Sequence, residues 1–256
     1  MTNTQFRPGG FRLLPPVVKN LLIINGLFFL ATISLQSVFK IDLNSLWGLY
    51  YIGSDKFQPF QFLTYMFLHG DITHLFFNMF AFWMFGNAIE NVWGPKRFII
   101  YYFATGLGAA FLHQLVQFIE VEMIISNLTH AGITSNMINE IITSGKYNPG
   151  ILEFVSESDL FSLYRTYNGP TVGASGSVFG ILLAFGMLFP NALIYLYFAI
   201  PVKAKWLVIG YGALELWSGL AASPGDNVAH FAHLGGMIFG FILIKIWKKK
   251  SMNRWM

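Results

Sequence analysis

The feature that most limits the possible folds of this chain is a succession of long apolar runs separated by short polar turns. About 20 mostly apolar residues let a helix cross a bilayer, and six runs approach that length, whereas the apolar piece at residues 192–200 is too short. Because 55% of the residues are hydrophobic and only 11% are charged, we predict an all-α membrane protein, a bundle of six transmembrane helices. The predicted spans are residues 17–39, 74–88, 98–118, 172–189, 204–222 and 228–247.

The placement of charge predicts how this bundle is oriented. If both termini are cytoplasmic, the inner segments hold 11 of the 16 basic residues and the outer loops hold 10 of the 12 acidic residues. That distribution follows the positive-inside rule. The basic excess of the chain is therefore a consequence of topology, and we do not expect it to bind nucleic acid.

The segments outside the spans divide the chain into three parts. Residues 1–15 are predicted to be a short cytoplasmic segment, residues 16–248 the membrane domain and residues 249–256 a basic cytoplasmic tail. Within the domain, residues 40–70 form an aromatic-rich loop suited to the membrane interface. Residues 119–170 are polar and mixed, and we predict a long external loop, part of which could be amphipathic helix.

The most unusual short motif is a serine between glycines, Gly173-Ala174-Ser175-Gly176, at the start of the fourth span. Glycines leave the hydroxyl uncrowded, and a helix that begins here would place unpaired N–H groups beside it. These are the requirements of a nucleophile with an oxyanion hole. Gly176 and Gly180 also form a small-xxx-small pattern, which serves helix packing without any catalysis.

A serine nucleophile needs a base, and the last span offers one. His233, Gly236 and Gly240 are spaced three and seven residues apart, so they share one helical face. If this face meets Gly176 and Gly180, His233 is brought beside the serine. His230 lies one turn earlier and is the weaker candidate for the base.

His74 and Asn78 are four residues apart and share a face of the second span. Polar side chains that face lipid are costly, so this pair should point into the bundle. It could donate hydrogen bonds to a developing oxyanion, or it could be an interhelical hydrogen-bonding pair.

These motifs together resemble the rhomboid intramembrane serine proteases. The resemblance rests on the three motifs above, on Leu63-Thr64-Tyr65-Met66-Phe67-Leu68-His69 before the second span, and on Phe85-Gly86-Asn87-Ala88-Ile89-Glu90 at its end. Their order and spacing match across roughly residues 16–248, apart from residues 119–170. Each motif is weak, but the ordered set is specific.

The resemblance implies a Ser–His dyad without a third carboxylate. Ser175 would be the nucleophile and His233 the general base, while His74, Asn78 and the backbone N–H of Ser175 would form the oxyanion hole. It also implies hydrolysis of transmembrane protein substrates near the outer ends of their helices, with no cofactor and no metal. A bacterial plasma membrane is the expected location of such a multi-pass chain.

Two features depart from the rhomboid pattern: the long 119–170 segment, and Phe179 at a position where many rhomboids carry a tyrosine that packs on the catalytic histidine. Phe179 could still stack but has no hydroxyl group. Glu215, in the middle of the fifth span, is expected to be a buried, hydrogen-bonded acid that lies deeper than Ser175. Glu90 is expected to be structural and close to Lys96 and Arg97.

Two other functions remain open on the sequence. A rhomboid-like protein without activity could bind membrane clients, although such relatives typically lack the serine or the histidine. A metalloprotease could use His230, His233 and His74 as zinc ligands, but the chain has no His-Glu-xx-His motif.

Overall fold

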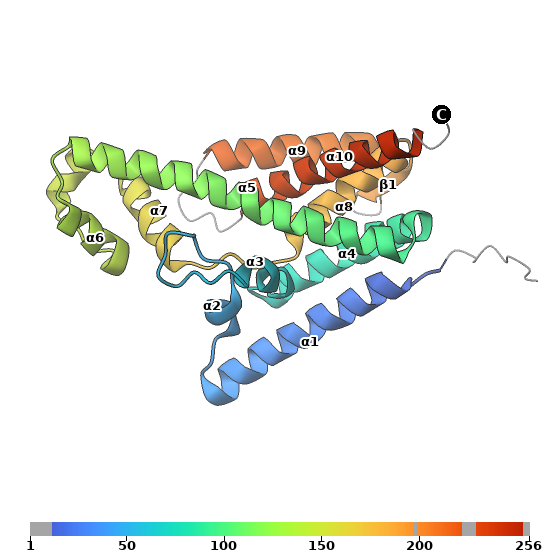
Figure 1. Ribbon diagram of the computed structural model, residues 1–256, viewed down its shortest axis with the longest axis horizontal. Helices are drawn as coiled ribbons and strands as arrows, with labels where there is room; N and C mark the ends of the chain where they lie inside the picture. The colour runs from blue at the N-terminus through green and yellow to red at the C-terminus, as the bar shows by residue number, and fades with distance from the viewer. Residues whose placement is uncertain (1–11, 197–198, 222–228, 253–256) are drawn as a thin grey trace, which may run out of the picture.

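The computed structural model describes residues 12–196, 199–221 and 229–252, and it is built almost entirely from helices (Figure 1). The predicted all-α membrane bundle is confirmed. Among the residues that the structure describes, four helices are long and apolar enough to cross a membrane, and two shorter apolar helices of 14 and 18 residues begin at Ser175 and Ala204. The bundle consists of α1 (Pro16–Phe39), α4 (Ile72–Trp93), α5 (Pro95–His130), α8 (Ser175–Leu188), α9 (Ala204–Ala221) and α10 (His230–Met252).

Parts of several predictions fall outside the described residues. They are the first eleven residues of the cytoplasmic segment 1–15, residues 197–198 of the short apolar piece 192–200, the boundaries of the fifth and sixth spans at Ala222 and Val228, and the last four residues of the basic tail.

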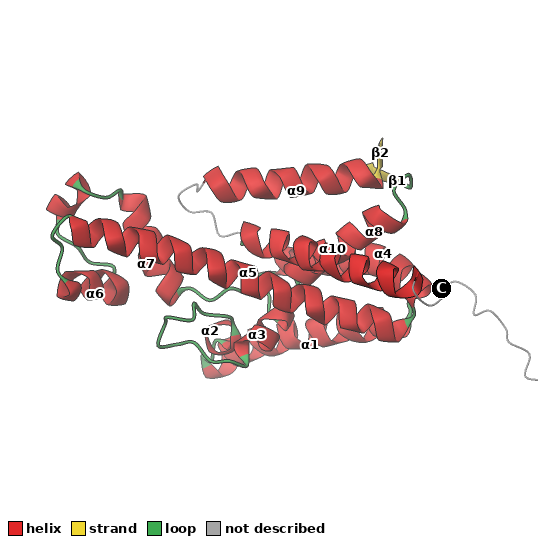
Figure 2. Ribbon diagram, turned by 45° about the horizontal axis from the view of Figure 1, so that its top comes forward, coloured by secondary structure: helices red, strands yellow, loops and turns green. Residues whose placement is uncertain are grey.

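The segment predicted as an external loop at residues 119–170 is in fact mostly helical. α5 has 36 residues, so it is about 54 Å long at 1.5 Å per residue and far exceeds a hydrocarbon layer of about 30 Å. Its far end packs against α6 (Ser135–Ser144), η2 (Pro149–Glu153) and α7 (Glu157–Asn168). This extension projects from one end of the bundle (Figures 1 and 2).

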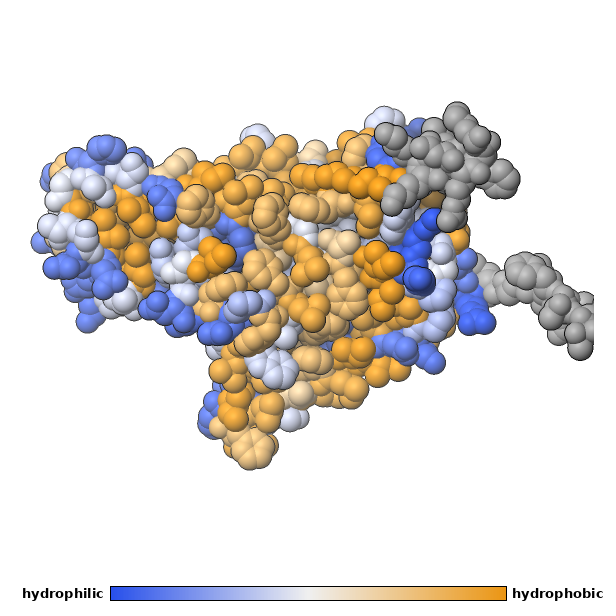
Figure 3. Space-filling model, viewed as in Figure 1, coloured by the Kyte–Doolittle hydropathy of each residue, from blue (hydrophilic) through white to orange (hydrophobic). Residues whose placement is uncertain are grey.

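The extension has a hydrophobic core of its own, which explains why it folds outside the bundle. The buried residues that form it are Tyr51, Val121, Ile124, Leu128, Ile138, Ile141, Ile151, Val155, Leu160 and Leu163. α7 begins with a capping box, in which the Ser156 hydroxyl accepts the N–H of Asp159 and the Asp159 carboxylate accepts that of Ser156. Hydrophilic residues are more frequent here than over the bundle, whose visible face is mainly hydrophobic (Figure 3).

The aromatic-rich segment 40–70 contains three short helices: α2 (Leu43–Trp47), α3 (Gln61–Thr64) and η1 (Tyr65–Phe67). It is tied to the bundle by Gln114 of α5, whose side chain accepts the N–H of Ile52 and donates to the carbonyl of Tyr50. A backbone bridge joins Leu49 to Thr171, just before α8. This segment therefore anchors the chain that leads into the serine motif.

At the opposite end, the short apolar piece that was expected not to cross forms part of a hairpin. β1 (Leu193–Leu196) pairs antiparallel with β2 (Ile200–Lys203), in a register that sets Leu193 opposite Lys203.

Glu90 has the structural role that was expected of it. Its carboxylate accepts the backbone N–H groups of Val17 and Val18, at 3.0 and 2.8 Å. These belong to the first turn of α1, where helix N–H groups lack partners within the helix and where negative charge is stabilising. Glu90 therefore fixes α1 to the end of α4.

Candidate active site

Ser175 is the first residue of α8, as the motif predicted. The preceding turn is held by Gly173, whose φ of 131° is disfavoured for other residues and whose N–H donates to the carbonyl of Tyr65 at 2.9 Å. The 14 residues of α8 rise only about 20 Å. If the helix ends at the inner boundary of the bilayer, Ser175 lies below the outer boundary, within the membrane.

His74 lies against this turn from the first turn of α4. Its backbone N–H donates to Asp71, the N-cap of the helix, and its Nδ1 accepts the N–H of Gly70 at 3.4 Å. A neutral ring that accepts at Nδ1 carries its hydrogen on Nε2. A Cβ at Gly173 would lie 2.9 Å from His74 Nε2 and 3.6 Å from Ser175 Oγ. Because Gly173 has no side chain, the Nε2–H group of His74 and the hydroxyl of Ser175 can both border the space that a Cβ would fill.

Asn78 is buried one turn further along α4. Its Nδ2 group donates to the carbonyl of His74 at 3.0 Å, and an amide nitrogen has a second hydrogen to offer. The structure therefore places Asn78 on the expected face, beside His74.

α8 and α10 meet at the glycines that the sequence singled out. A Cβ at Gly236 would overlap the carbonyl of Gly176, and one at Gly180 would lie 3.0 Å from the carbonyl of Gly236. Gly240 faces α5 instead, where a Cβ would overlap the hydroxyl of Tyr101. Close approach of the helix backbones is thus possible only because these residues lack side chains.

His233 is brought to the serine helix by this packing. Its ring stacks on Phe179, with centroids 4.2 Å apart and an interplanar angle of 8°. Phe179 lies one turn after Ser175, so the histidine covers the helix face that carries the serine. The aromatic contact of the expected tyrosine is kept without the hydroxyl group.

The expectation that no carboxylate reaches this histidine is wrong. Glu215 Oε2 lies 2.9 Å from Nδ1 of His233, and both residues are 8% exposed. Measured from the outer ends of the predicted spans, Glu215 lies deeper than Ser175. Counted from the inner ends of the helices, Glu215 lies about 16 Å from Ala204 in α9, Ser175 about 20 Å from Leu188 in α8, and His233 about 22 Å from Lys248 in α10. The two depths in α8 and α9 therefore differ by only about 4 Å.

The same carboxylate oxygen also contacts His230, whose Nδ1 lies 2.6 Å away. Glu215, His230 and His233 form a group whose donor atoms all lie within 4.8 Å of one another, a spacing compatible with one metal ion. His74 does not belong to this group. The zinc ligands considered from the sequence included His74, whereas the described residues bring Glu215 to His230 and His233 instead.

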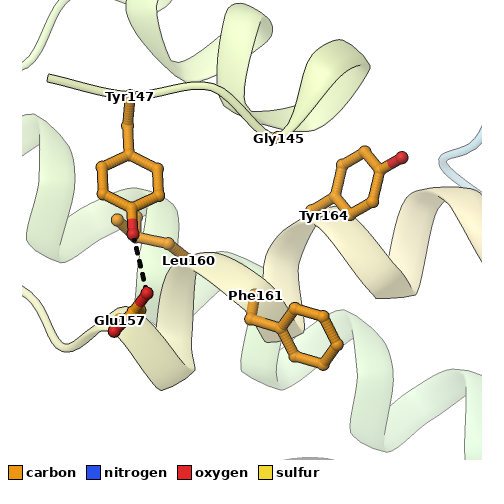
Figure 4. Close-up of a pocket in the computed structure, with 6 residues that line it drawn as sticks. All are labelled: Gly145, Tyr147, Glu157, Leu160, Phe161 and Tyr164. Atoms are coloured by element: carbon orange, nitrogen blue, oxygen red, sulfur yellow. Dashed lines mark hydrogen bonds between the residues drawn. The ribbon is translucent and has the colours of Figure 1, made fainter.

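A separate pocket of about 250 Å³ lies in the extension (Figure 4). Tyr147 and Glu157 meet there through a 3.2 Å hydrogen bond. The residues that line it are Gly145, Tyr147, Glu157, Leu160, Phe161 and Tyr164, none of which the sequence singled out for chemistry.

The bundle carries a serine at a helix start, with His74 against the preceding turn and His233 stacked on Phe179 one turn later. These features define a class: multi-pass helical membrane proteins with a polar site built around a serine. The family follows from comparison with known proteins. The Rhomboid domain matches residues 56–250, and the chain belongs to the rhomboid family.

Curated relatives agree with this assignment. RHOMBOID-like protein 12, mitochondrial, of Arabidopsis thaliana is 32% identical over 68% of this chain and 42% of its own length. Rhomboid protease GluP of Bacillus subtilis is 29% identical over 71% of this chain and 24% of its own. Rhomboid protease AarA of Providencia stuartii is 27% identical over 70% and 52%. The matched region thus spans about half or less of these relatives.

Proposed function

We propose that the protein is an intramembrane serine endopeptidase that hydrolyses peptide bonds in transmembrane segments of other proteins. The observation that carries this proposal is the position of Ser175, between the Nε2 edge of His74 and the helix face covered by His233. Two relatives are named as rhomboid proteases. We also propose that the site includes Glu215, which the sequence reading left aside.

Glu215 would fix the histidine in its basic form. A carboxylate only accepts hydrogen bonds, so Nδ1 of a neutral His233 carries the hydrogen and Nε2 keeps its lone pair. That lone pair would take the proton of Ser175 Oγ as the oxygen attacks the peptide carbonyl. His233 would then return the proton to the leaving amine, and a water molecule would release the acyl group by the same steps in reverse. Glu215 stays ionised and stabilises the imidazolium.

The negative charge on the carbonyl oxygen would be met on the other side of the serine. His74 Nε2–H, the second amide hydrogen of Asn78 and the backbone N–H of Ser175 are the donors that we assign to it. Donors fixed before the reaction lower the barrier because they need no reorganisation.

The substrate would be a transmembrane helix that unwinds near its outer end, since a helical peptide bond is shielded by its own hydrogen bonds and side chains. We propose a bacterial plasma membrane as the location, and the charge distribution given above supports an orientation with both termini cytoplasmic. The lipid bilayer and transmembrane proteins would be its partners.

The test uses purified protein in detergent with a chelator and a fluorophosphonate probe, followed by mass spectrometry of the labelled peptide. We expect label on Ser175, no label in Ser175→Ala, and little in His233→Ala, with circular dichroism showing that both variants fold. A folded wild-type protein that takes no label would favour the client-binding relative without activity. Cleavage that requires a metal would favour the metalloprotease.

A further inference from the structure

The geometry of Glu215, His230 and His233 leads us to propose an inhibitory binding site for a divalent transition-metal ion such as Zn²⁺. The three donors are one carboxylate and two imidazoles, which is a ligand set that suits zinc. This inference rests on the proposed function, because the site would act through His233.

The arrangement of donors supports a shared ion. Both Nδ1 atoms point at the same oxygen, Glu215 Oε2, from 2.6 and 2.9 Å. In a tetrahedral zinc site with bonds of about 2.0–2.1 Å, neighbouring ligand atoms lie about 3.3 Å apart. Side-chain shifts of less than about 1 Å would open the group to an ion, and a three-ligand site leaves a fourth position for water.

The position of the group favours exchange with solution. Glu215, His230 and His233 retain side-chain exposures of 10%, 14% and 10%, so the group is enclosed but not sealed. Their helices α9 and α10 pack side by side (Figure 2). An ion there would join the two helices, with one ligand from α9 and two from α10.

Inhibition follows from the tautomer that the metal imposes on His233. An imidazole bound through Nδ1 must carry its hydrogen on Nε2, so the proton that Nδ1 held toward Glu215 moves to Nε2. The ring keeps one hydrogen in total and no bond to carbon changes. Nε2 then has no lone pair for Ser175, and Glu215 is occupied by the ion. Zinc would therefore remove the base without blocking the serine itself.

Metal binding is tested apart from activity. Ser175→Ala protein without a polyhistidine tag is titrated with Zn²⁺ by calorimetry, and we expect one ion per chain. His230→Asn is the informative second change, because the asparagine amide can still donate to Glu215 but is a poor zinc ligand. The double variant Ser175→Ala/His230→Asn should bind no Zn²⁺. The control Ser175→Ala/His130→Asn, changed at an exposed histidine on α5, should still bind one ion.

Inhibition is then measured as cleavage of a transmembrane substrate against free Zn²⁺, with each variant compared to its own rate in chelator. We expect at least a tenfold loss for wild type and for His130→Asn, and a loss below twofold for His230→Asn. Equal inhibition of His230→Asn and wild type, or no ion bound to Ser175→Ala, would overturn the site. Fluorophosphonate labelling in chelator reports the proposed function separately. Activation by zinc would contradict the inhibitory role.

Discussion

At the scale of single residues, the carboxylate of Glu215 is the group whose role is least expected for this family resemblance. It holds Nδ1 of His233 while Phe179 stacks on the ring, so both the tautomer and the plane of the imidazole are fixed. In a Ser–His–Asp triad, replacing the carboxylate by an amide lowers kcat by about 10⁴-fold because the wrong tautomer forms. Stacking on Phe179 should preserve part of the orientation here.

We therefore expect Glu215→Gln to lower kcat about 10- to 1000-fold with KM nearly unchanged. The measurement is steady-state cleavage of a transmembrane substrate, with the rate of fluorophosphonate labelling of Ser175 as a second readout. Asn78→Ala serves as a comparison, since loss of an oxyanion donor should lower both kcat and the rate of labelling but leave the pH dependence of labelling as in wild type, whereas loss of the Glu215 carboxylate should change it. If Glu215→Gln cleaves at the wild-type rate, Glu215 is only a structural partner of the two histidines.

His69 makes a different contribution, to the pH dependence of stability. It is buried beside His74, and neither ring nitrogen has a hydrogen-bond partner among the described residues. Burial, with the nearby His74 as a smaller cause, lowers its pKa to about 3, from 6.5. Between these values the unfolded chain binds a proton that the folded protein does not, so this residue's contribution to stability is complete above pH 6.5 and declines as the pH falls toward 3.

The expected result is a lower midpoint of thermal unfolding in detergent at pH 5 than at pH 7.5. His69→Leu, which has no titrating group, should reduce that difference, whereas His130→Leu, at an exposed position, should leave it as in wild type. A wild-type difference that His69→Leu does not change would assign the pH dependence to other groups.

At the scale of helices, the contact between α8 and α10 is set by backbone atoms. Because a Cβ at Gly236 would overlap the Gly176 carbonyl, Gly236→Ala must push the two helices apart and with them Ser175 and His233. A displacement of about 1 Å can cost about 100-fold in rate, so we expect a loss of that order and a lower unfolding temperature. Gly210→Ala is the matched control, because nothing lies within 4 Å of a Cβ there. Wild-type activity of Gly236→Ala would show that the contact is not needed.

The helices also show what the sequence could and could not predict. Apolar length and basic turns predicted the bundle, and the glycine spacing predicted where α8 and α10 meet, because both are local or periodic signals. Amphipathic helix was expected within residues 119–170, but the unbroken continuation of α5 to His130 was not. Residues 119–130 mix polar and apolar side chains, and their hydrophobic partners come from α6 and α7, far along the chain. Glu215 was misjudged because its depth depends on where α8 and α9 end, which composition does not fix.

At the scale of the whole molecule, the structure has a hydrophobic bundle between two polar ends (Figure 3). At one end lies the extension of α5, α6 and α7; at the other, α4 turns into α5 at Lys96 and Arg97. About 20 residues of α5 suffice to cross the hydrocarbon layer, so about 16 residues, or about 24 Å, of this 36-residue helix lie beyond it. The serine, at the start of α8, faces the end that carries the extension.

The positive-inside rule predicts that the end with Lys96 is cytoplasmic and that the extension lies outside. The chain contains no cysteine, so a single introduced cysteine is a unique label. In intact bacterial cells that express the protein, a membrane-impermeant maleimide should label Asn136→Cys, at an exposed position in α6. It should label Lys96→Cys, also exposed, only after the cells are lysed. Labelling of Lys96→Cys before lysis, with Asn136→Cys protected, would invert the topology and place Ser175 toward the cytoplasm.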